Sequence, residues 1–214
     1  MDKFEIIDMA TWPRAAIYSL YTEKWPTTSY SLMKKLSVSK FVPYLKEKGI
    51  KFVPAIIWLV GREFNRIENF RLAVKDGKLG KWEVIHPLVP TLNKDKNMTF
   101  HNIRFEEDFG KFYEAYIQEQ QENIEKTSLF ANRVPDNFFM VSVFPFLHFD
   151  GGSMQVSGKN SYAPFVAIGK YNEEMLLPCV VMGNHAAQDA WHISEFFKGL
   201  QEGIDAPEEW CKLK

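Results

Sequence analysis

The sequence lacks several features that would place it in a specialised class of protein. Its 214 residues include only two cysteines, Cys179 and Cys211, so no disulfide scaffold is expected and a reducing compartment is the simpler assignment. No apolar run approaches the roughly 18 residues that a membrane-spanning helix needs. The 26 basic and 27 acidic residues nearly cancel, so the charge gives no reason to expect nucleic acid or an anionic membrane as a partner.

Targeting and linker signals are also missing. The first residues, MDKFEIIDMATW, have neither the basic start nor the apolar segment of a secretory signal, and we therefore expect a cytoplasmic location. No repeat, low-complexity tract or long linker divides the chain. We expect one domain over residues 1–214, a length that supports a substantial core.

Familiar catalytic and metal-binding motifs are absent too. No glycine-rich phosphate loop follows a strand, no CxxC or HExxH spacing occurs, and no serine-hydrolase elbow is found. No metal site is therefore expected. His86, His148 and His185 remain as the main candidate acid–base groups.

The predicted elements indicate an α/β fold. Helices are predicted within residues 39–49, from a Ser N-cap to Gly49, and within 53–67, 104–126 and 190–200. In the third of these, Phe105, Phe109, Phe112, Tyr116 and Ile124 fall on one face; in the fourth, Ala190, Ile193, Phe197 and Leu200 do. A hairpin is predicted around Asp76-Gly77, and strands within 138–147, 163–171 and 174–185. Continuous apolar strands indicate a mixed sheet whose central strands are covered on both faces.

Aromatic residues are abundant, with 18 Phe, 8 Tyr and 6 Trp. Two explanations of this aromatic content are open: a large aromatic core, or an aromatic-lined pocket or subunit interface.

One stretch, LLPCVVMGNHAAQDAWHISEFF, ends an apolar run at Asn184 and His185, with Asp189 four residues later. The end of a strand that leads into a helix is where α/β folds expose reactive groups. A histidine there is equally compatible with a polar strand end, and Asp189 with the favourable charge of a first helical turn. The pattern alone leaves both interpretations open.

The segment HAAQDAWH resembles the His-x-x-x-Asp-Gly signature of the chloramphenicol acetyltransferases, which dihydrolipoyl acyltransferases share. The resemblance extends along nearly the whole chain, through DMATWPR, FRLAVKDGKLGKWEVIHP, FFMVSVFP and YAPFVAIGKY. It implies a two-layer sandwich with a mixed β-sheet and a homotrimer in which the base of one subunit faces the acceptor pocket of its neighbour. It also implies an antibiotic-resistance enzyme that acetylates chloramphenicol with acetyl-CoA as co-substrate.

By this resemblance His185 is the general base, and Ser142 supports the oxyanion. Asp189 and Arg14 form an ion pair that shapes the surroundings of the base. Positions that contact the nucleotide end of CoA are Lys51, Lys170 and Tyr171. Positions near the small-molecule hydroxyl acceptor are Leu20, Tyr21, Leu92, Met154 and Ala167.

The chain departs from the family pattern at four places. Asn184 replaces the first of two paired histidines, Ala190 replaces a glycine, and Val53 replaces an aromatic residue near adenine. Gly151-Gly152 stands where a serine and a pocket phenylalanine are usual, which predicts a weaker apolar grip on an aryl substrate. Two other functions remain as alternatives: a CoA-dependent acyltransferase for another hydroxyl compound, and a non-catalytic trimer that binds ligand.

Overall fold

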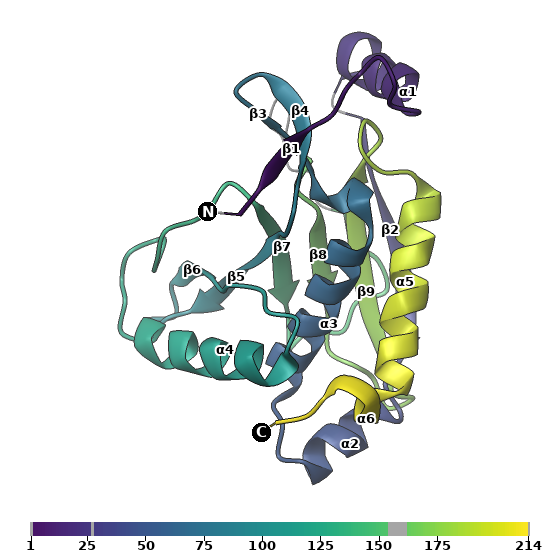
Figure 1. Ribbon diagram of the computed structural model, residues 1–214. Helices are drawn as coiled ribbons and strands as arrows, with labels where there is room; N and C mark the ends of the chain where they lie inside the picture. The colour runs from purple at the N-terminus through teal and green to yellow at the C-terminus, as the bar shows by residue number, and fades with distance from the viewer. Residues whose placement is uncertain (1, 27, 154–161, 214) are drawn as a thin grey trace.

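The computed structural model describes residues 2–26, 28–153 and 162–213 (Figure 1). Its strands are β1 (Phe4–Ile6), β2 (Ser29–Ser37), β3 (Leu72–Lys75), β4 (Lys78–Trp82), β5 (His86–Leu92), β6 (Met98–Asn102), β7 (Phe138–Val143), β8 (Phe165–Ile168) and β9 (Leu176–Asn184). Its helices are α1 (Ala15–Ser19), the π-helix η1 (Leu20–Lys24), α2 (Phe41–Glu47), α3 (Phe52–Arg66), the 3₁₀-helix η2 (Glu68–Arg71), α4 (Phe109–Asn123), α5 (Ala190–Asp205) and α6 (Pro207–Trp210).

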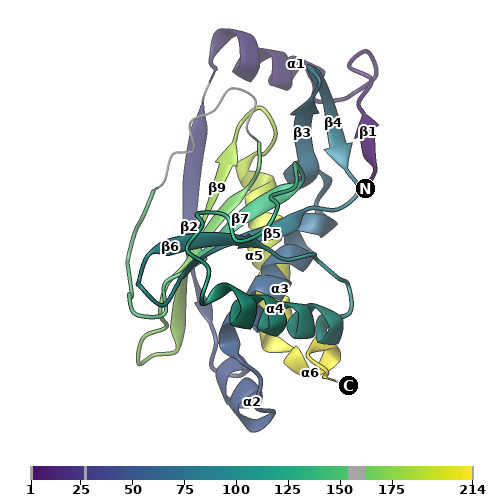
Figure 2. The same ribbon diagram turned by 90° about the vertical axis from the view of Figure 1, so that its left-hand side faces the viewer.

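Six strands form the main sheet in the order β2-β9-β8-β7-β5-β6. The β5–β7 and β7–β8 pairs are parallel and the other pairs are antiparallel, which confirms the mixed sheet. Helices α3, α4 and α5 cover one face of this sheet, as Figure 2 shows from the side. The predicted two-layer α/β sandwich is therefore confirmed.

A second, smaller sheet has the order β1-β4-β3 and stands at one end of the molecule (Figure 1). The hairpin β3–β4 turns at Asp76-Gly77, where both residues have positive φ, of 51° and 74°. Two consecutive positive φ angles are what a two-residue turn of matching twist requires, and Asp-Gly adopts them at low cost. The predicted hairpin is confirmed.

Three details of the predicted helices are wrong. Helix α2 begins after Lys40 and has no side-chain cap, because the hydroxyls of Ser37 and Ser39 lie 3.1 Å apart as partners of each other. Helix α4 begins only at Phe109, so Phe105 is buried from the preceding loop. Ile124 follows this helix and is 52% exposed.

The N-terminal end of α5 also differs from expectation. Ala190 is exposed, whereas Ile193, Phe197 and Leu200 are buried as predicted. The first turn of the helix extends beyond the edge of the core, so its side chains are not all covered. Strand β2 was not predicted at all, since its Lys34-Lys35 pair interrupts a simple alternation. It lies at the edge of the sheet, where lysine side chains reach solvent.

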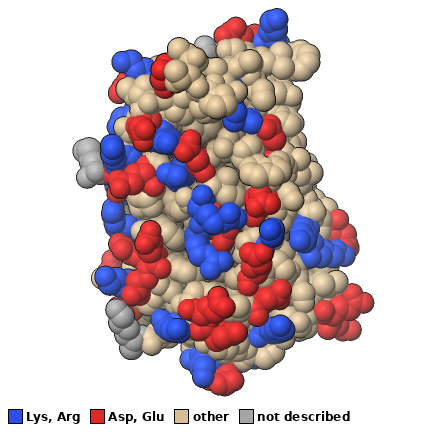
Figure 3. Space-filling model, turned by 45° about the vertical axis from the view of Figure 1, so that its right-hand side comes forward, with Lys and Arg blue, Asp and Glu red and all other residues tan. Residues whose placement is uncertain are grey.

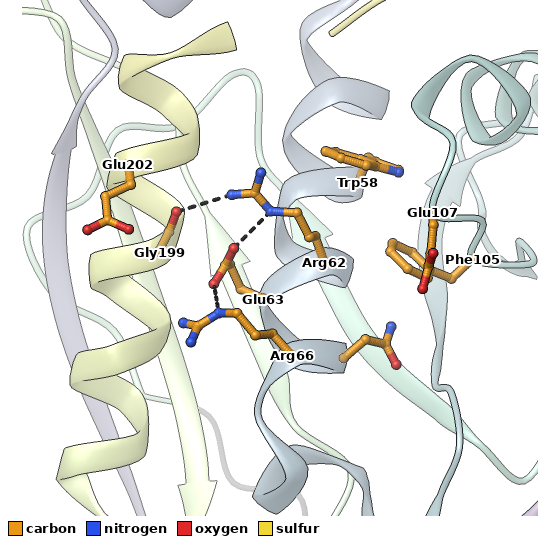
Figure 4. Close-up of a pocket in the computed structure, with 9 residues that line it drawn as sticks. Trp58, Arg62, Glu63, Arg66, Phe105, Glu107, Gly199 and Glu202 are labelled. Atoms are coloured by element: carbon orange, nitrogen blue, oxygen red, sulfur yellow. Dashed lines mark hydrogen bonds and ion pairs between the residues drawn. The ribbon is translucent and has the colours of Figure 1, made fainter. Parts of the chain in front are cut away.

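A buried carboxylate on α3 lies against α5 (Figure 4). Glu63 is 2% exposed, and each of its oxygens accepts from an arginine: Arg62 Nε at 2.9 Å and Arg66 Nε at 2.7 Å. Arg62 also donates to the carbonyl of Gly199 at 3.3 Å. A Cβ atom at Gly199 would overlap the Glu63 carboxylate, so the absent side chain is what lets the helices approach.

We expect Gly199→Ala to destabilise the protein by about 1–3 kcal/mol, the usual cost of overpacking. Helix propensity alone would favour alanine by about 1 kcal/mol, so the sign of the change distinguishes the two effects. Urea denaturation measures it, with Ser194→Ala at an exposed site of the same helix as control. A Gly199→Ala protein at least as stable as the parent would show that the carboxylate moves aside freely.

His101 is buried between β6 and α4. His101 is fully buried, its ring lies 6.3 Å from that of Tyr116, and neither nitrogen has a hydrogen-bond partner among the described residues. Burial, and the charge of Lys126 to a lesser degree, lower the pKa of His101 from 6.5 to about 4. The neutral ring is therefore the form compatible with the fold.

We expect acid to destabilise the parent through His101. The unfolded chain binds this proton first, so stability is complete above the unfolded pKa and is lost as the pH falls toward the folded pKa. Between about pH 7.5 and about pH 4.5 the loss is roughly 2–3 kcal/mol. His101→Leu removes this contribution, which urea denaturation at the two pH values measures. An equal loss in parent and variant would contradict the prediction.

Basic and acidic side chains alternate over the face drawn in Figure 3, with no extended field of one sign. Within the described residues, no helix is both long and apolar enough to span a membrane.

Candidate acyl-transfer site

His185 lies in a turn that two side chains hold in place. Asn184 Oδ1 accepts from the backbone N–H of Ala186 at 2.9 Å, and the backbone N–H of Asn184 donates to Gln188 Oε1 at 3.0 Å. Gln188 is fully buried and donates to the carbonyl of Asn69 at 2.8 Å. Asn184, the departure from the paired histidines, is thus a structural part of the turn. The turn fixes the backbone of His185 directly after β9.

The imidazole of His185 is held between two tyrosine rings. Its centroid lies 4.9 Å from that of Tyr21 and 4.3 Å from that of Tyr30, with interplanar angles of 17° and 27°. Its Nδ1 lies 3.7 Å from Asp189 Oδ1. For Nε2, no hydrogen-bond partner occurs in the described part of the chain. The side chain of His185 is 30% exposed, so solvent reaches part of the ring.

The ion pair expected between Arg14 and Asp189 is present. Both terminal nitrogens of Arg14 bond the carboxylate, one to each oxygen. The hydrogen bond from Arg14 lowers the pKa of Asp189 below its usual range, which keeps the carboxylate ionised. Arg14 directly precedes α1, at the end of the N-terminal arm (residues 7–14). The ion pair therefore joins the N-terminal arm to the start of α5.

Ser142 is buried on β7 and lies opposite Ala167 of β8, which in turn lies opposite Val180 of β9. His185 lies two strand spacings of about 4.8 Å across the sheet from Ser142, and five residues of about 3.3 Å each further along β9 than Val180. The two residues are therefore roughly 19 Å apart. No hydrogen bond to the Ser142 hydroxyl occurs within residues 2–26, 28–153 and 162–213. One chain therefore does not bring Ser142 and His185 together.

An apolar hollow of about 480 Å³ is lined in part by Phe138 and Met140 of β7. Phe138, Met140 and Ser142 alternate along β7 and share the sheet face opposite α3, α4 and α5 (Figure 2). The other lining residues come from β5, β6 and the chain before β7, and they are Leu88, Phe100, Phe130, Asn132, Arg133 and Val134. This set of residues was not predicted from the sequence, although the alternation along β7 could have indicated it.

The residues predicted for the acceptor are divided between the two regions. Leu20 and Tyr21 open the π-helix beside His185, whereas Ala167 lies opposite Ser142. Leu92 ends β5, is 58% exposed and does not line the hollow. Met154 lies outside the described residues. Gly151 and Gly152 are exposed, and a Cβ atom at Gly151 would meet nothing within 4 Å.

The residues predicted for CoA lie near one another. Lys51 is the N-cap of α3, and the next residue, Phe52, packs on the ring of Tyr171 at 6.1 Å. Lys170 follows β8, and its carbonyl lies 2.8 Å from His148 Nδ1. Because β7 and β8 are parallel, this cluster lies at the same end of the sheet as Ser142. Among the described residues, no three His, Cys, Asp or Glu side chains gather as a metal site would require.

The fold is similar to those of solved acyltransferase structures. A chloramphenicol acetyltransferase superposes with a TM-score of 0.85 at 19% identity, covering 94% of this chain and 100% of the other. The dihydrolipoamide acetyltransferase of Azotobacter vinelandii superposes with a TM-score of 0.69 at 11% identity, covering 92% and 89%. These likenesses define the class of fold as that of acyltransferase cores.

Sequence comparison identifies the family. The sequence model of the chloramphenicol acetyltransferase family matches residues 2–201. A chloramphenicol acetyltransferase of Bacillus pumilus is 32% identical over 189 residues, which is 85% of this chain and 86% of the relative. Chloramphenicol acetyltransferase 2 of Haemophilus influenzae is 32% identical over 212 residues, or 94% and 97%. The chain belongs to the chloramphenicol acetyltransferase family, a family of acyltransferases.

Proposed function

We propose that this protein transfers the acetyl group of acetyl-CoA to a hydroxyl of chloramphenicol. The observation that carries the proposal is the held imidazole of His185, whose Nδ1 faces Asp189 while Nε2 has no hydrogen-bond partner among the described residues. Family membership supports chloramphenicol as the acceptor, and the apolar hollow on the same sheet face as Ser142 suits its aromatic ring. A role in antibiotic resistance would follow.

The reaction is a direct transfer within one complex of enzyme and both substrates. His185 Nε2 takes the proton of the acceptor hydroxyl as its oxygen attacks the thioester carbonyl. The new C–O bond leaves a tetrahedral oxyanion, which the Ser142 hydroxyl stabilises by donating a hydrogen bond. The intermediate then breaks its C–S bond, and the CoA thiolate leaves with the proton from His185. The negative charge of Asp189 stabilises the imidazolium between these steps.

We further propose that the working form is a homotrimer. The roughly 19 Å between Ser142 and His185 in one chain is too long for two groups that act on the same carbonyl. A site completed by His185 of one subunit and Ser142 of the next removes this conflict. Lys51, Lys170 and Tyr171, at the same end as Ser142, would then hold the nucleotide of CoA. Both cysteines are free and buried, which supports a reducing compartment such as the cytoplasm.

Release of free thiol from acetyl-CoA tests the proposal. Parent protein is assayed with chloramphenicol and with a panel of other primary and secondary alcohols. Turnover with chloramphenicol supports the proposal, whereas turnover with another alcohol alone would assign a different acceptor. Binding of CoA without turnover of any acceptor would leave only a ligand-binding trimer.

For Ser142→Ala we expect a kcat about 10²–10³-fold lower, since an oxyanion donor acts mainly in the transition state. The KM of the acceptor should change little. Steady-state kinetics measures both, and Ser142→Thr, which keeps a hydroxyl, is the matched variant. A change confined to KM would place Ser142 in ground-state binding instead.

A further inference from the structure

His192 makes a hydrogen bond that defines its chemical form. It occupies the third position of α5, and its Nδ1 accepts from the backbone N–H of Asp189, the N-cap, at 3.0 Å. A backbone amide can only donate, so Nδ1 carries no proton and the hydrogen of the neutral ring is on Nε2. This is the reciprocal half of a capping box, in which glutamate or glutamine is the usual third residue.

The N-cap residue Asp189 also places its carboxylate next to the proposed base, His185. Asp189 is bonded through both oxygens to Arg14, and its Oδ1 lies 3.7 Å from His185 Nδ1. Its backbone is held by His192 and its side chain by Arg14. These two restraints together determine where the carboxylate lies relative to His185.

We propose that His192 is a positioning residue for acyl transfer: in its neutral form it caps α5 and thereby fixes Asp189 between Arg14 and His185. The inference rests on the proposed function, because it assigns His192 a role in supporting His185. His192 itself does not touch the reacting atoms in this account.

Protonation of His192 would undo this arrangement. An Nδ1–H cannot accept from the Asp189 amide, so the cap would be lost. The charged groups that face the ring are Arg14, from the N-terminal arm, and Asp189, whose Oδ2 lies 4.0 Å from Nδ1. An imidazolium would draw the carboxylate away from Arg14. The Trp191 ring meets His192 edge-on at 5.1 Å and adds no charge.

The environment keeps the ring neutral under ordinary conditions. Burial, followed by the charge of Arg14, lowers the pKa of His192 below 6.5. A lowered folded pKa means that the cap is fully present at neutral pH and is lost as the pH falls from the unfolded toward the folded value. The site therefore contains an acid-sensitive histidine that does not itself touch the reacting atoms.

The test compares His192→Gln with His192→Ala. Gln supplies an oxygen that accepts from the Asp189 amide and cannot protonate, whereas Ala supplies none. Lys198→Gln, at an exposed position of the same helix, is the control. At neutral pH we expect His192→Gln to keep kcat close to that of the parent and His192→Ala to lose about 10–100-fold with an unchanged KM for acetyl-CoA.

The pH profile gives the decisive readout. On the acid side, log kcat/KM of the parent should fall more steeply than that of His192→Gln. The difference in slope should approach one, because the parent binds one further proton, at His192. Equal slopes in parent and His192→Gln would overturn the inference, as would full activity in His192→Ala. If His192→Ala fails to fold, the comparison with Gln alone decides.

A measurement without substrates separates this inference from the proposed function. Thermal stability of the parent should fall more between about pH 7 and about pH 5 than that of His192→Gln. That result in a protein inactive toward every acceptor would retain the cap and reject the acyl-transfer function. Active proteins whose stabilities fall equally would reject the cap and retain the function.

Discussion

Mixed trimers of His185→Ala and Ser142→Ala subunits are expected to recover about a quarter of the parent activity, although each variant alone is nearly inactive. If each site takes His185 from one subunit and Ser142 from the next, an equal random mixture completes one site in four. The physical reason is the roughly 19 Å between the two residues within a chain. Subunits are mixed under mild denaturant, returned to buffer and assayed for thiol release.

A matched mixture provides the control. His185→Ala combined with the double variant His185→Ala/Ser142→Ala contains no complete site and should remain inactive. No recovery in the first mixture, after exchange has been verified by mass, would mean that both groups act within one chain. Sedimentation of the parent as a monomer would lead to the same conclusion.

His185→Ala is expected to lower kcat by about 10²–10⁴-fold, the usual contribution of a positioned general base. Affinity for CoA should be unchanged, because the predicted CoA residues lie at the opposite end of the sheet. Single-turnover assays measure the first quantity and calorimetry the second. His185→Gln keeps a polar side chain of similar length and should lose as much activity. Residual activity above about a tenth of the parent would exclude His185 as the base.

The sequence predicted those parts of the fold that local chemistry determines. Asp76-Gly77 specified its turn because few residue pairs accept two positive φ angles, and the continuous apolar run of β9 indicated a strand buried on both faces. Strand β2 could not be predicted in the same way. It is stabilised by pairing with β9 along nine residues, a long-range contact that no local pattern of β2 reports.

For the candidate site, too, local patterns in the sequence predicted some residues and long-range contacts determined the others. The spacing of Arg14, His185 and Asp189 identified residues that the fold does bring together, but only through the family resemblance. The tyrosine pair around His185 and the apolar hollow lined by Phe138 and Met140 come from segments far apart in sequence, so spacing could not reveal them. His192 escaped notice because a histidine in a capping box takes the place of the usual glutamate or glutamine.

Chloramphenicol-dependent release of free thiol from acetyl-CoA by the parent protein tests the central claim most directly. We expect steady turnover without an initial burst, one thiol released for each O-acetylated chloramphenicol formed, no release without chloramphenicol, and release about 10²–10⁴-fold slower in His185→Ala. Thiol release that proceeds equally without an acceptor, or acetyl groups that accumulate on the protein, would contradict it.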